Sequence, residues 1–196
     1  MAIPSAKTRP TLETERLVLR PFEPGDASRV QLLAGEREIA ATTVRIPHPY
    51  EDGMAEDWIA THQDDFEKGV SVNFAITLKD TSELVGAIGL MLNRDHENAE
   101  MGYWIGKPYW NHGYCTEAAR AVLHYAFAEL RLNRVFAHHF SRNTASGRVM
   151  QKLGMRHEGR RRQHVKKWGQ FIDSEMYGIL RNELESTGRP EQAGHF

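Results

Sequence analysis

The chain has 196 residues, of which 40% are hydrophobic and 26% are charged, values that exclude a disordered chain. No apolar run approaches the roughly 20 residues that cross a bilayer. Its 25 basic and 26 acidic residues leave a formal net charge of -1, so no global electric field draws the protein to nucleic acid.

The first ten residues, MAIPSAKTRP, lack the apolar core of a secretion signal, and the single cysteine, Cys115, excludes an internal disulfide framework. We therefore expect a cytoplasmic protein. We find no composition shift that divides the chain, and we predict one domain over residues 11–184 between flexible ends at residues 1–10 and 185–196.

In the first half of the chain, apolar alternation and helical spacing predict both strands and helices. The predicted elements are a strand at 16–22, a short helix after Asp26, a helix at 54–66 with Met54, Trp58, Ile59 and Phe66 near one face, a hairpin of 72–78 with 84–92, and a strand at 99–106.

The second half continues the alternation of helices and strands. A helix at 116–130 precedes a strand at 133–140, and a further helix is capped by Asn143 and ended by Gly154. Strands at 156–165 and 171–180 follow. The pattern predicts an α/β fold, with a mixed sheet of about seven strands flanked by about four helices.

The stretch YWNHGYCTEA, Tyr109 to Ala118, places Gly113 between a predicted strand and a predicted helix. Free amides of the first helical turn and of the preceding loop there form a concave nest that attracts phosphate oxygens. The stretch YWNHGYCTEA lacks the glycine-lysine ending of a Walker loop and the three glycines of a dinucleotide fingerprint. By spacing alone, a plain strand-to-helix connection explains it equally well.

Two longer blocks identify a family resemblance. The blocks AEMGYWIGKPYWNHGYCTEAARAVLHYAF and NRVFAHHFSRNTASGRVMQKLGMRHEG resemble the GNAT superfamily of acetyl-CoA-dependent N-acetyltransferases, and they look closest to its RimJ/RimL-type branch, which acetylates the N-termini of ribosomal proteins. The resemblance implies the single-domain acyl-CoA N-acyltransferase fold, a mostly antiparallel sheet, and acetyl-CoA as co-substrate with no metal.

The resemblance also implies where the coenzyme is held. The pyrophosphate would meet the loop amides, the pantetheine arm would lie along a strand backbone, and Asn143 would hold that arm. The residues so assigned are Tyr103, Trp104, Ile105, Asn111, His112, Gly113, Tyr114, Cys115, Thr116, Asn143 and Ser146.

Three positions depart from the family pattern. Asn111 replaces a common glycine, although asparagine tolerates a positive φ better than most residues. Cys115 replaces glycine or alanine and is interpreted as a packing residue rather than a nucleophile. Met150 stands where many relatives place a tyrosine that protonates the departing thiolate. A methionine cannot donate that proton, so any acid must lie elsewhere.

The implied reaction is attack of a neutral amine on a thioester carbonyl. Deprotonation at pH 7 costs about 4.6 kcal/mol for a lysine side chain but only about 1.1 kcal/mol for an α-amine, so a weakly equipped site favours the N-terminal amine of a protein or peptide. Glu100 is the candidate general base, or alternatively a solvated strand-end carboxylate. Ser146 is the candidate proton donor, or alternatively a partner of first-turn amides.

The ten histidines contain no His-Glu-x-x-His pattern, and adjacent His138 and His139 on one strand must point to opposite faces. We expect no metal site. His138 or His164 is a candidate for lining the acceptor pocket, where it would assist deprotonation.

The dense basic segment RRRQHVKKW, Arg160 to Trp168, is either a solvated sheet edge or a guide for an acidic partner, a coenzyme phosphate or ribosomal RNA through Arg160 to Lys167.

A small-molecule amine (polyamine, aminoglycoside or amino-acid-like) is the alternative acceptor, with Trp58, Trp110 and Tyr50 as walls of its pocket. A non-catalytic coenzyme- or RNA-binding module is the alternative function. We expect a monomer or homodimer that contacts no membrane.

Overall fold

The computed structural model describes residues 8–187. Of the predicted flexible ends, residues 1–7 and 188–196 lie outside the described part of the chain. The first domain boundary, at residue 11, stays a prediction. At the other boundary, helix α7 (Arg181–Thr187) continues past residue 184, so residues 185–187 belong to a helix. No helix within residues 8–187 combines the length and the apolar character needed to cross a membrane.

Eight strands of the described chain form one sheet, in the order β1-β2-β3-β4-β5-β6-β8-β7. They are β1 (Leu12–Glu13), β2 (Leu17–Arg20), β3 (Ser71–Leu78), β4 (Leu84–Asn93), β5 (Asn98–Ile105), β6 (Arg134–Phe140), β7 (Arg156–Lys167) and β8 (Gln170–Leu180). All neighbouring pairs are antiparallel except β5 with β6. The predicted mixed α/β fold is confirmed, and the strand beyond the expected seven is the two-residue β1.

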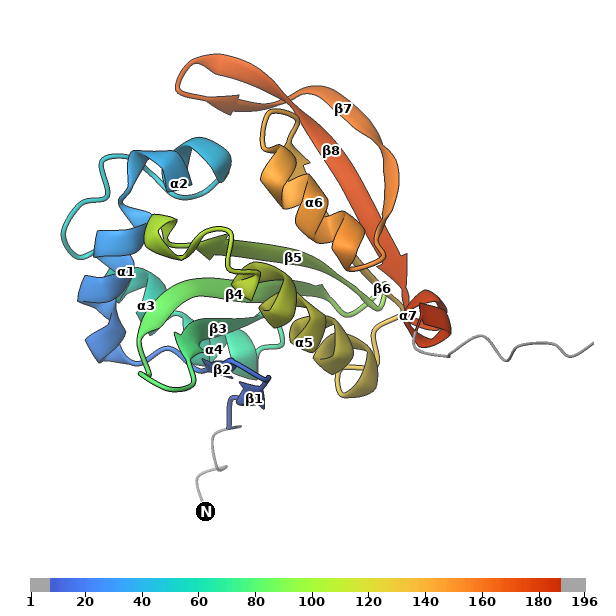
Figure 1. Cartoon of the computed structure of the whole chain (residues 1–196), viewed down its shortest axis with the longest axis horizontal. Helices are drawn as coiled ribbons and strands as arrows, with labels where there is room; N and C mark the ends of the chain where they lie inside the picture. The colour runs from blue at the N-terminus through green and yellow to red at the C-terminus, as the bar shows by residue number, and fades with distance from the viewer. Residues whose placement is uncertain (1–7, 188–196) are drawn as a thin grey trace, which may run out of the picture.

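Helices cover both faces of the sheet (Figure 1). The helices before α7 are α1 (Ala27–Ala34), α2 (Arg37–Thr42), α3 (Met54–Ala60), α4 (His62–Glu67), α5 (Tyr114–Ala128) and α6 (Thr144–Lys152), with short 3-10 turns at Pro24–Asp26 and Lys107–Tyr109. α5 and α6 pack on one face through the larger core cluster, and α1 and α3 pack on the other face through the smaller one.

Local signals explain α5 and α6. Gly113 takes a left-handed conformation, with φ of 83°, directly before α5, and Asn143 Oδ1 caps α6 by accepting from the amide of Ser146 at 3.3 Å. The apolar stripe of α5 is rich in alanine, including Ala118, Ala119 and Ala126, all fully buried. Small side chains let this helix lie close to the sheet, so its first turn is held firmly beside β5.

The region before β3 differs from the prediction. The helix expected at 54–66 is two helices, α3 and α4, which meet at Thr61. Phe66 packs against the larger core cluster, Ile59 lies in the smaller one, and Met54 is 38% exposed. The single apolar face expected for 54–66 is therefore wrong.

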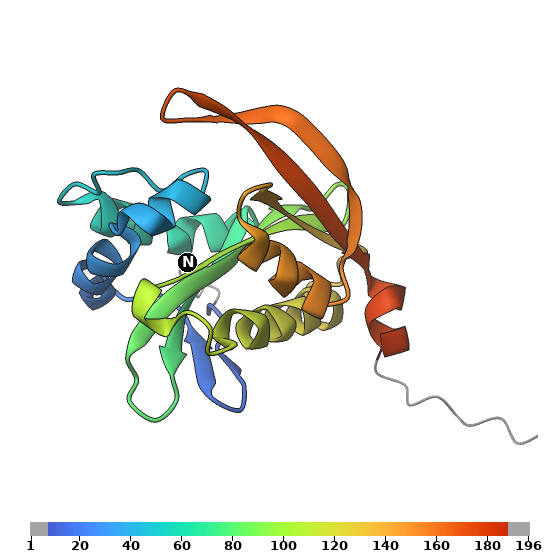
Figure 2. The same ribbon diagram turned by 45° about the horizontal axis from the view of Figure 1, so that its top comes forward.

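The sheet divides between β5 and β6. These strands pair only from Asn98 to Glu100 on β5 and from Arg134 to Phe136 on β6, although both continue for several residues. The β7–β8 hairpin arches from the second half of the sheet back over α2 (Figure 2). At its tip, Lys167 Nζ donates to the carbonyl of Ile46 at 2.6 Å. The split and the hairpin together define the space where a ligand can enter the fold.

Candidate active site

Glu100 and His138 meet where β5 and β6 begin to separate. Glu100 is the last residue of β5 paired with β6, and His138 lies two residues beyond its partner Phe136 on the same face. His138 Nδ1 is 3.2 Å from Glu100 Oε1, and both side chains are partly exposed. His139 points to the other face, where it stacks on Tyr177. The predicted opposition of the two histidines is confirmed.

The hydrogen bond from His138 holds the pKa of Glu100 below its ordinary value, against the opposing effect of burial. The positive charges of Arg45 and Arg161 lower this pKa further. The carboxylate is thus ionised at neutral pH. An ionised carboxylate that accepts from Nδ1 leaves Nε2 of the neutral imidazole as the basic atom.

Tyr103 and Ser146 meet across the other face of the split. The Tyr103 hydroxyl lies 2.8 Å from Ser146 Oγ and joins β5 to the first turns of α6. Burial raises the pKa of the Tyr103 phenol, so the hydroxyl stays protonated at neutral pH. Met150 is 1% exposed within the core, and Ser146 and Tyr103 are the hydroxyl groups placed near the split instead.

The loop before α5 has the backbone of an anion nest. Asn111 has φ of 65° and Gly113 has φ of 83°, so both adopt the left-handed conformation that turns successive amides toward one side. α5 begins at Tyr114, two residues before the predicted start, and the amides of Tyr114, Cys115 and Thr116 lie in its unpaired first turn. His112 stacks on Tyr114, with ring centroids 5.5 Å apart.

Arg16 lies beside this nest, a position that no motif or spacing indicates. Its Nη1 donates to the carbonyl of His112 at 3.0 Å, and its guanidinium lies 4.8 Å from the Tyr114 ring centroid. Glu117, in the first turn of α5, accepts from the amide and Nε of Arg16, both at 2.8 Å. Arg16, directly before β2, thereby ties the loop to α5, and its guanidinium lies next to the amides in an ion pair with Glu117.

The edge of β5 beyond the split has backbone groups that pair with no neighbouring strand of the described chain. The Trp104 carbonyl points to β4, since a Cβ on Gly86 would come within 2.4 Å of its oxygen. Carbonyl directions alternate along a strand, so Tyr103 and Ile105 direct theirs to the open side. The indole of Trp110 donates to the Ile105 carbonyl at 2.6 Å. The backbone of Tyr103 and Ile105, rather than that of Trp104, borders the split.

Cys115 and Asn143 flank the same opening. Burial raises the pKa of the Cys115 thiol to about 12, so the thiol is protonated at neutral pH. Asn143 accepts one hydrogen bond as the α6 cap, and its amide nitrogen has no hydrogen-bond partner among residues 8–187. That nitrogen is available to a ligand.

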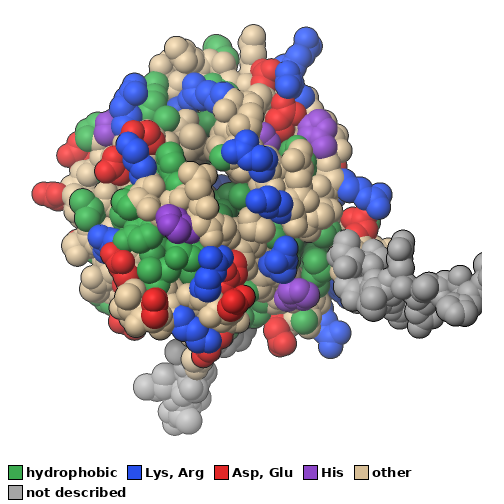
Figure 3. All heavy atoms as spheres, viewed as in Figure 1, with side chains coloured by type: hydrophobic (Ala, Val, Ile, Leu, Met, Phe, Trp, Pro, Cys, Tyr) green, Lys and Arg blue, Asp and Glu red, His purple; other side chains and the backbone are tan. Residues whose placement is uncertain are grey.

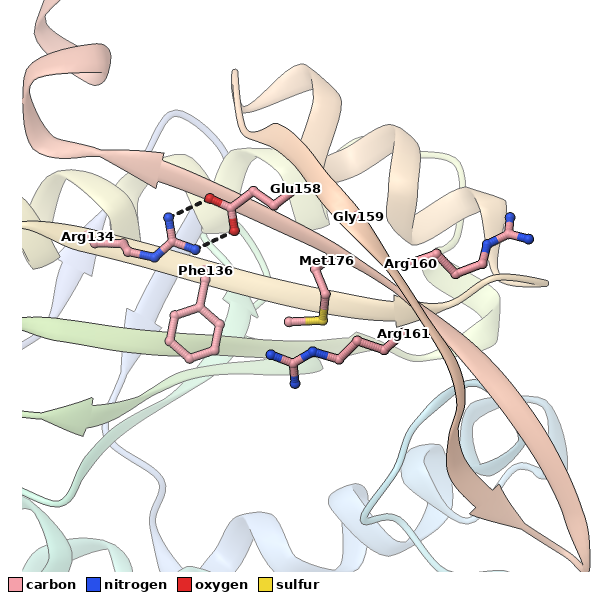
Figure 4. A pocket seen from close by; sticks show the side chains of 7 residues that line it. All are labelled: Arg134, Phe136, Glu158, Gly159, Arg160, Arg161 and Met176. Carbon is pink, nitrogen blue, oxygen red and sulfur yellow. Dashed lines mark hydrogen bonds and ion pairs between the residues drawn. The ribbon is translucent and has the colours of Figure 1, made fainter.

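On the Glu100 face, a cavity of about 380 Å³ lies over β6, β7 and β8 (Figure 4). Its lining residues are Arg134, Phe136, Glu158, Gly159, Arg160, Arg161 and Met176. None of the proposed aromatic walls lines it: Trp58 and Tyr50 pack against the smaller core cluster, and Trp110 is bonded to β5. His164 contacts Arg161, with Nε2 3.4 Å from its Nη1, at the surface.

The basic segment from Arg160 to Lys167 lies on the edge strand β7, whose register shifts twice. Arg160 Nε donates to Glu175 at 2.6 Å, and Lys167 is buried against the loop before α3. Several of its charges are therefore engaged within the protein, and the shifts break the regular alternation expected of a basic stripe. No cluster of three or more His, Cys, Asp or Glu side chains suited to a metal occurs in the described part of the chain.

Comparison with known proteins agrees with this geometry. Residues 16–156 match the Acetyltransferase (GNAT) domain family, and the chain belongs to it. It is 33% identical over 175 residues to the uncharacterized N-acetyltransferase p20 of Bacillus licheniformis, covering 88% of this chain and 97% of that protein. The GNAT-family acetyltransferase of Bacillus anthracis has a similar structure, with a TM-score of 0.79 at 28% identity, over 88% of this chain and 99% of the other.

A third likeness shows the fold alone. RimL, a ribosomal L7/L12 α-N-protein acetyltransferase solved with coenzyme A, superposes with a TM-score of 0.80 at 16% identity, over 87% of this chain and 98% of its own. The predicted family and its fold are thus confirmed, and the protein is an N-acetyltransferase.

Proposed function

We propose that this protein transfers the acetyl group of acetyl-CoA to the N-terminal α-amine of a protein or peptide. The observation that supports this most directly is the split between β5 and β6. The anion nest and the Tyr103–Ser146 pair border it on one side, and the Glu100–His138 pair borders it on the other. A donor and an acceptor can therefore approach the same gap from opposite faces.

The residues beside the α5 face fit the coenzyme. The left-handed loop at Asn111 and Gly113, with the first-turn amides and Arg16, suits a diphosphate. The backbone edge of β5 and the free amide nitrogen of Asn143 suit the amide groups of a pantetheine arm. When bound, acetyl-CoA supplies the reactive thioester. Figure 3 views this side of the molecule and shows Lys and Arg side chains beside a central hollow.

On the opposite face, Glu100 and His138 prepare the amine. The ionised carboxylate holds the acceptor ammonium, and Nε2 of His138 takes a proton from it, directly or through water. An α-amine needs only about 1.1 kcal/mol for deprotonation at pH 7, against about 4.6 kcal/mol for a lysine side chain. This modest demand favours an α-amine over a lysine side chain.

Ser146 Oγ donates a proton to the leaving thiolate and takes one back from solvent water, so the serine hydroxyl is restored at the end of the step. The Tyr103 hydroxyl fixes the position of Ser146 Oγ at 2.8 Å and remains protonated itself. The pair replaces the tyrosine that Met150 displaces.

Release of free thiol from acetyl-CoA tests this function, with peptides that differ in the first residue as acceptors and mass spectrometry to locate the acetyl group. We expect the wild type to acetylate the α-amine. In Glu100→Gln the rate of this acetylation should fall by about a hundredfold or more. Glu129→Gln, an exposed change at the far end of α5, is the matched control. No turnover with peptides, polyamines or aminoglycosides would contradict the proposal.

A small-molecule amine is the second candidate, because the hairpin tip restricts the acceptor side. Lys167 binds the backbone of Val44 and Ile46, and Trp168 lies 5.1 Å from the guanidinium of Arg37. Trp168→Ala should open this contact and raise kcat/KM for peptides relative to single amino acids. Phe171→Ala, which removes a more exposed aromatic side chain on the same hairpin, is the control. A wild-type enzyme that acetylates only small amines would select this candidate.

A further inference from the structure

The cavity on the Glu100 face combines an apolar floor with positive charge. Phe136 and Met176 form its floor, and these two residues neighbour Glu100 and His138 in the strand register. An acceptor whose amine reaches the Glu100–His138 pair therefore places its adjoining atoms over this floor. The charges around the floor decide which acceptors are accommodated.

Three arginines line the cavity, and two of them are neutralised. Arg134 forms a two-pronged ion pair with Glu158 at one end of the cavity, as Figure 4 shows. Arg160 points away and pairs with Glu175. Arg161 extends beneath Met176 toward Phe136. Within residues 8–187 it has no carboxylate within 4.0 Å, so its charge remains available to a ligand.

A second available arginine lies on the other side of Glu100. Arg45 Nη1 contacts Met91 Sδ at 2.6 Å, and Met91 is the direct cross-strand neighbour of Glu100 in the β4–β5 register. Arg45 likewise forms no ion pair with a carboxylate of the described residues. Glu100 thus lies between two guanidinium groups that both act on its carboxylate, one above β4 and one above β6 and β8, so two positive charges face a single negative charge.

We propose that the acceptor carries an anionic group close to its amine. Glu100 and His138 hold the amine, while Arg45 and Arg161 hold a carboxylate or phosphate a few bonds away. The inference rests on the proposed acetyl transfer and narrows its substrate class. A guanidinium binds such an anion through two parallel hydrogen bonds, whereas a polyamine brings further positive charge to a site where two guanidinium groups already outnumber the single Glu100 carboxylate.

Two kinds of acceptor carry an anionic group close to an amine. One is a peptide N-terminus with aspartate or glutamate at its second position, and the other is a free amino acid with its own α-carboxylate. The apolar floor accommodates the side chain of either. The acceptor series must therefore include both kinds of molecule, each with a neutral partner of equal size.

The test compares kcat/KM for matched acceptors at fixed acetyl-CoA. The peptides are identical except for Asp, Asn or Lys at the second position, and the small acceptors are an amino acid, its amide and spermidine. We expect the anionic member of a pair to exceed the neutral one by about tenfold and the cationic one by more. Preference confined to the peptide pair or to the amino-acid pair identifies the source.

Arginine variants connect the preference to the cavity. Arg45→Gln and Arg161→Gln should each reduce the preference for the anionic acceptor severalfold, and the double variant should remove it. Arg162→Gln is the matched control, because it deletes the same charge next to Arg161 at a residue outside the cavity lining. All three positions are exposed, so folding should be retained.

Equal or better turnover of the neutral and cationic acceptors would overturn the inference while leaving the proposed function in place. Calorimetric binding of the same peptides to the coenzyme-loaded protein gives a readout that needs no catalysis. Arginine-dependent binding of the acidic peptide without acetylation of any amine would support the anion site and contradict the proposed function. Absence of charge preference in binding would overturn the inference by itself.

Discussion

The Tyr103 hydroxyl and Ser146 Oγ lie 2.8 Å apart across the opening between the two halves of the sheet. Beyond Glu100, β5 and β6 no longer share backbone hydrogen bonds, so this side-chain contact ties β5 to α6 where the sheet is open. Burial raises the pKa of the Tyr103 hydroxyl, so this group stays protonated where it contacts Ser146, at the mouth of a space suited to a thioester. The Tyr103–Ser146 pair therefore both ties β5 to α6 and contains the proposed proton donor.

Ser146→Ala should lower kcat by about a hundredfold, because it deletes the proposed proton donor to the thiolate. The KM for acetyl-CoA should change little. Tyr103→Phe keeps the ring and removes only the hydrogen bond, so we expect a smaller loss of about fivefold. Steady-state kinetics with a peptide acceptor measure both. A Ser146→Ala enzyme with wild-type kcat would exclude Ser146 as the acid.

Gly113→Ala should weaken coenzyme A binding. Gly113 has φ of 83°, a conformation that costs an L-residue about 1 kcal/mol, and the new methyl group would stand in the nest near Arg16. We expect the Kd measured by calorimetry to rise about tenfold or more while the fold is retained. Gly25→Ala is the control, since nothing lies within 4 Å of an added Cβ there and its φ is not positive. Unchanged affinity in Gly113→Ala would show that the loop does not hold the coenzyme.

Those elements with local signals were predictable from the sequence. The Asn143 cap, the Gly154 stop and the alanine stripe of α5 act within a few residues, so α5 and α6 were found nearly at their observed bounds. The six-residue α2 has no full period of apolar residues, and it was missed. The break between α3 and α4 at Thr61 has no glycine or proline to announce it, and it was missed as well.

The residues of the candidate site likewise divide into those that the local sequence predicts and those that it does not. The left-handed Asn111 and Gly113 follow from residue type, and the family resemblance pointed to their loop. The Glu100–His138 contact depends instead on where β5 and β6 stop pairing, and Arg45 reaches Met91 from a loop 46 residues earlier in the chain. Such proximities arise from packing of distant segments. No spacing within one segment encodes them.

Glu175 should stabilise the protein in a pH-dependent manner. Its carboxylate accepts from His157 and Ser141, both at 2.8 Å, and from Arg160 at 2.6 Å. The hydrogen bond from His157, with those from Ser141 and Arg160, lowers the pKa of Glu175 from 4.5 to about 2 against the effect of burial. The folded state therefore holds its proton less tightly than the unfolded state, and this stabilisation is complete above pH 4.5 and is lost as the pH falls toward 2.

Urea unfolding of the wild type and Glu175→Gln from pH 7 to pH 3 measures this contribution. The variant should unfold at lower urea at pH 7, and the two midpoints should converge as the pH falls below about 4.5. Asp64→Asn, which removes an exposed carboxylate paired with Lys68 on α4, is a control expected to show a smaller difference. A constant gap between wild type and Glu175→Gln at every pH would contradict the assignment.

His62 should make the protein less stable in mild acid. It is 2% exposed between Phe22 and Trp58, and neither ring nitrogen has a hydrogen-bond partner among residues 8–187. Burial, with a smaller effect from the charge of Arg9, lowers the pKa of His62 from 6.5 to about 4. The unfolded state therefore binds the proton more tightly, and stability falls as the pH decreases from 6.5 to about 4, by up to about 3 kcal/mol.

His62→Leu fills a similar volume without a titrating group, so its free energy of unfolding should lose this dependence on pH. Chemical denaturation of both proteins at pH 7.5, 6, 5 and 4 gives the comparison, and the difference between the two curves isolates His62 from the other titrating groups. The free energy of unfolding of the variant, relative to that of the wild type, should rise steadily as the pH falls from 7.5 to 4. Only the wild type must keep a neutral imidazole inside an aromatic cluster. Parallel curves would mean that the buried imidazole is solvated or paired in solution, and that its burial does not penalise the charged form.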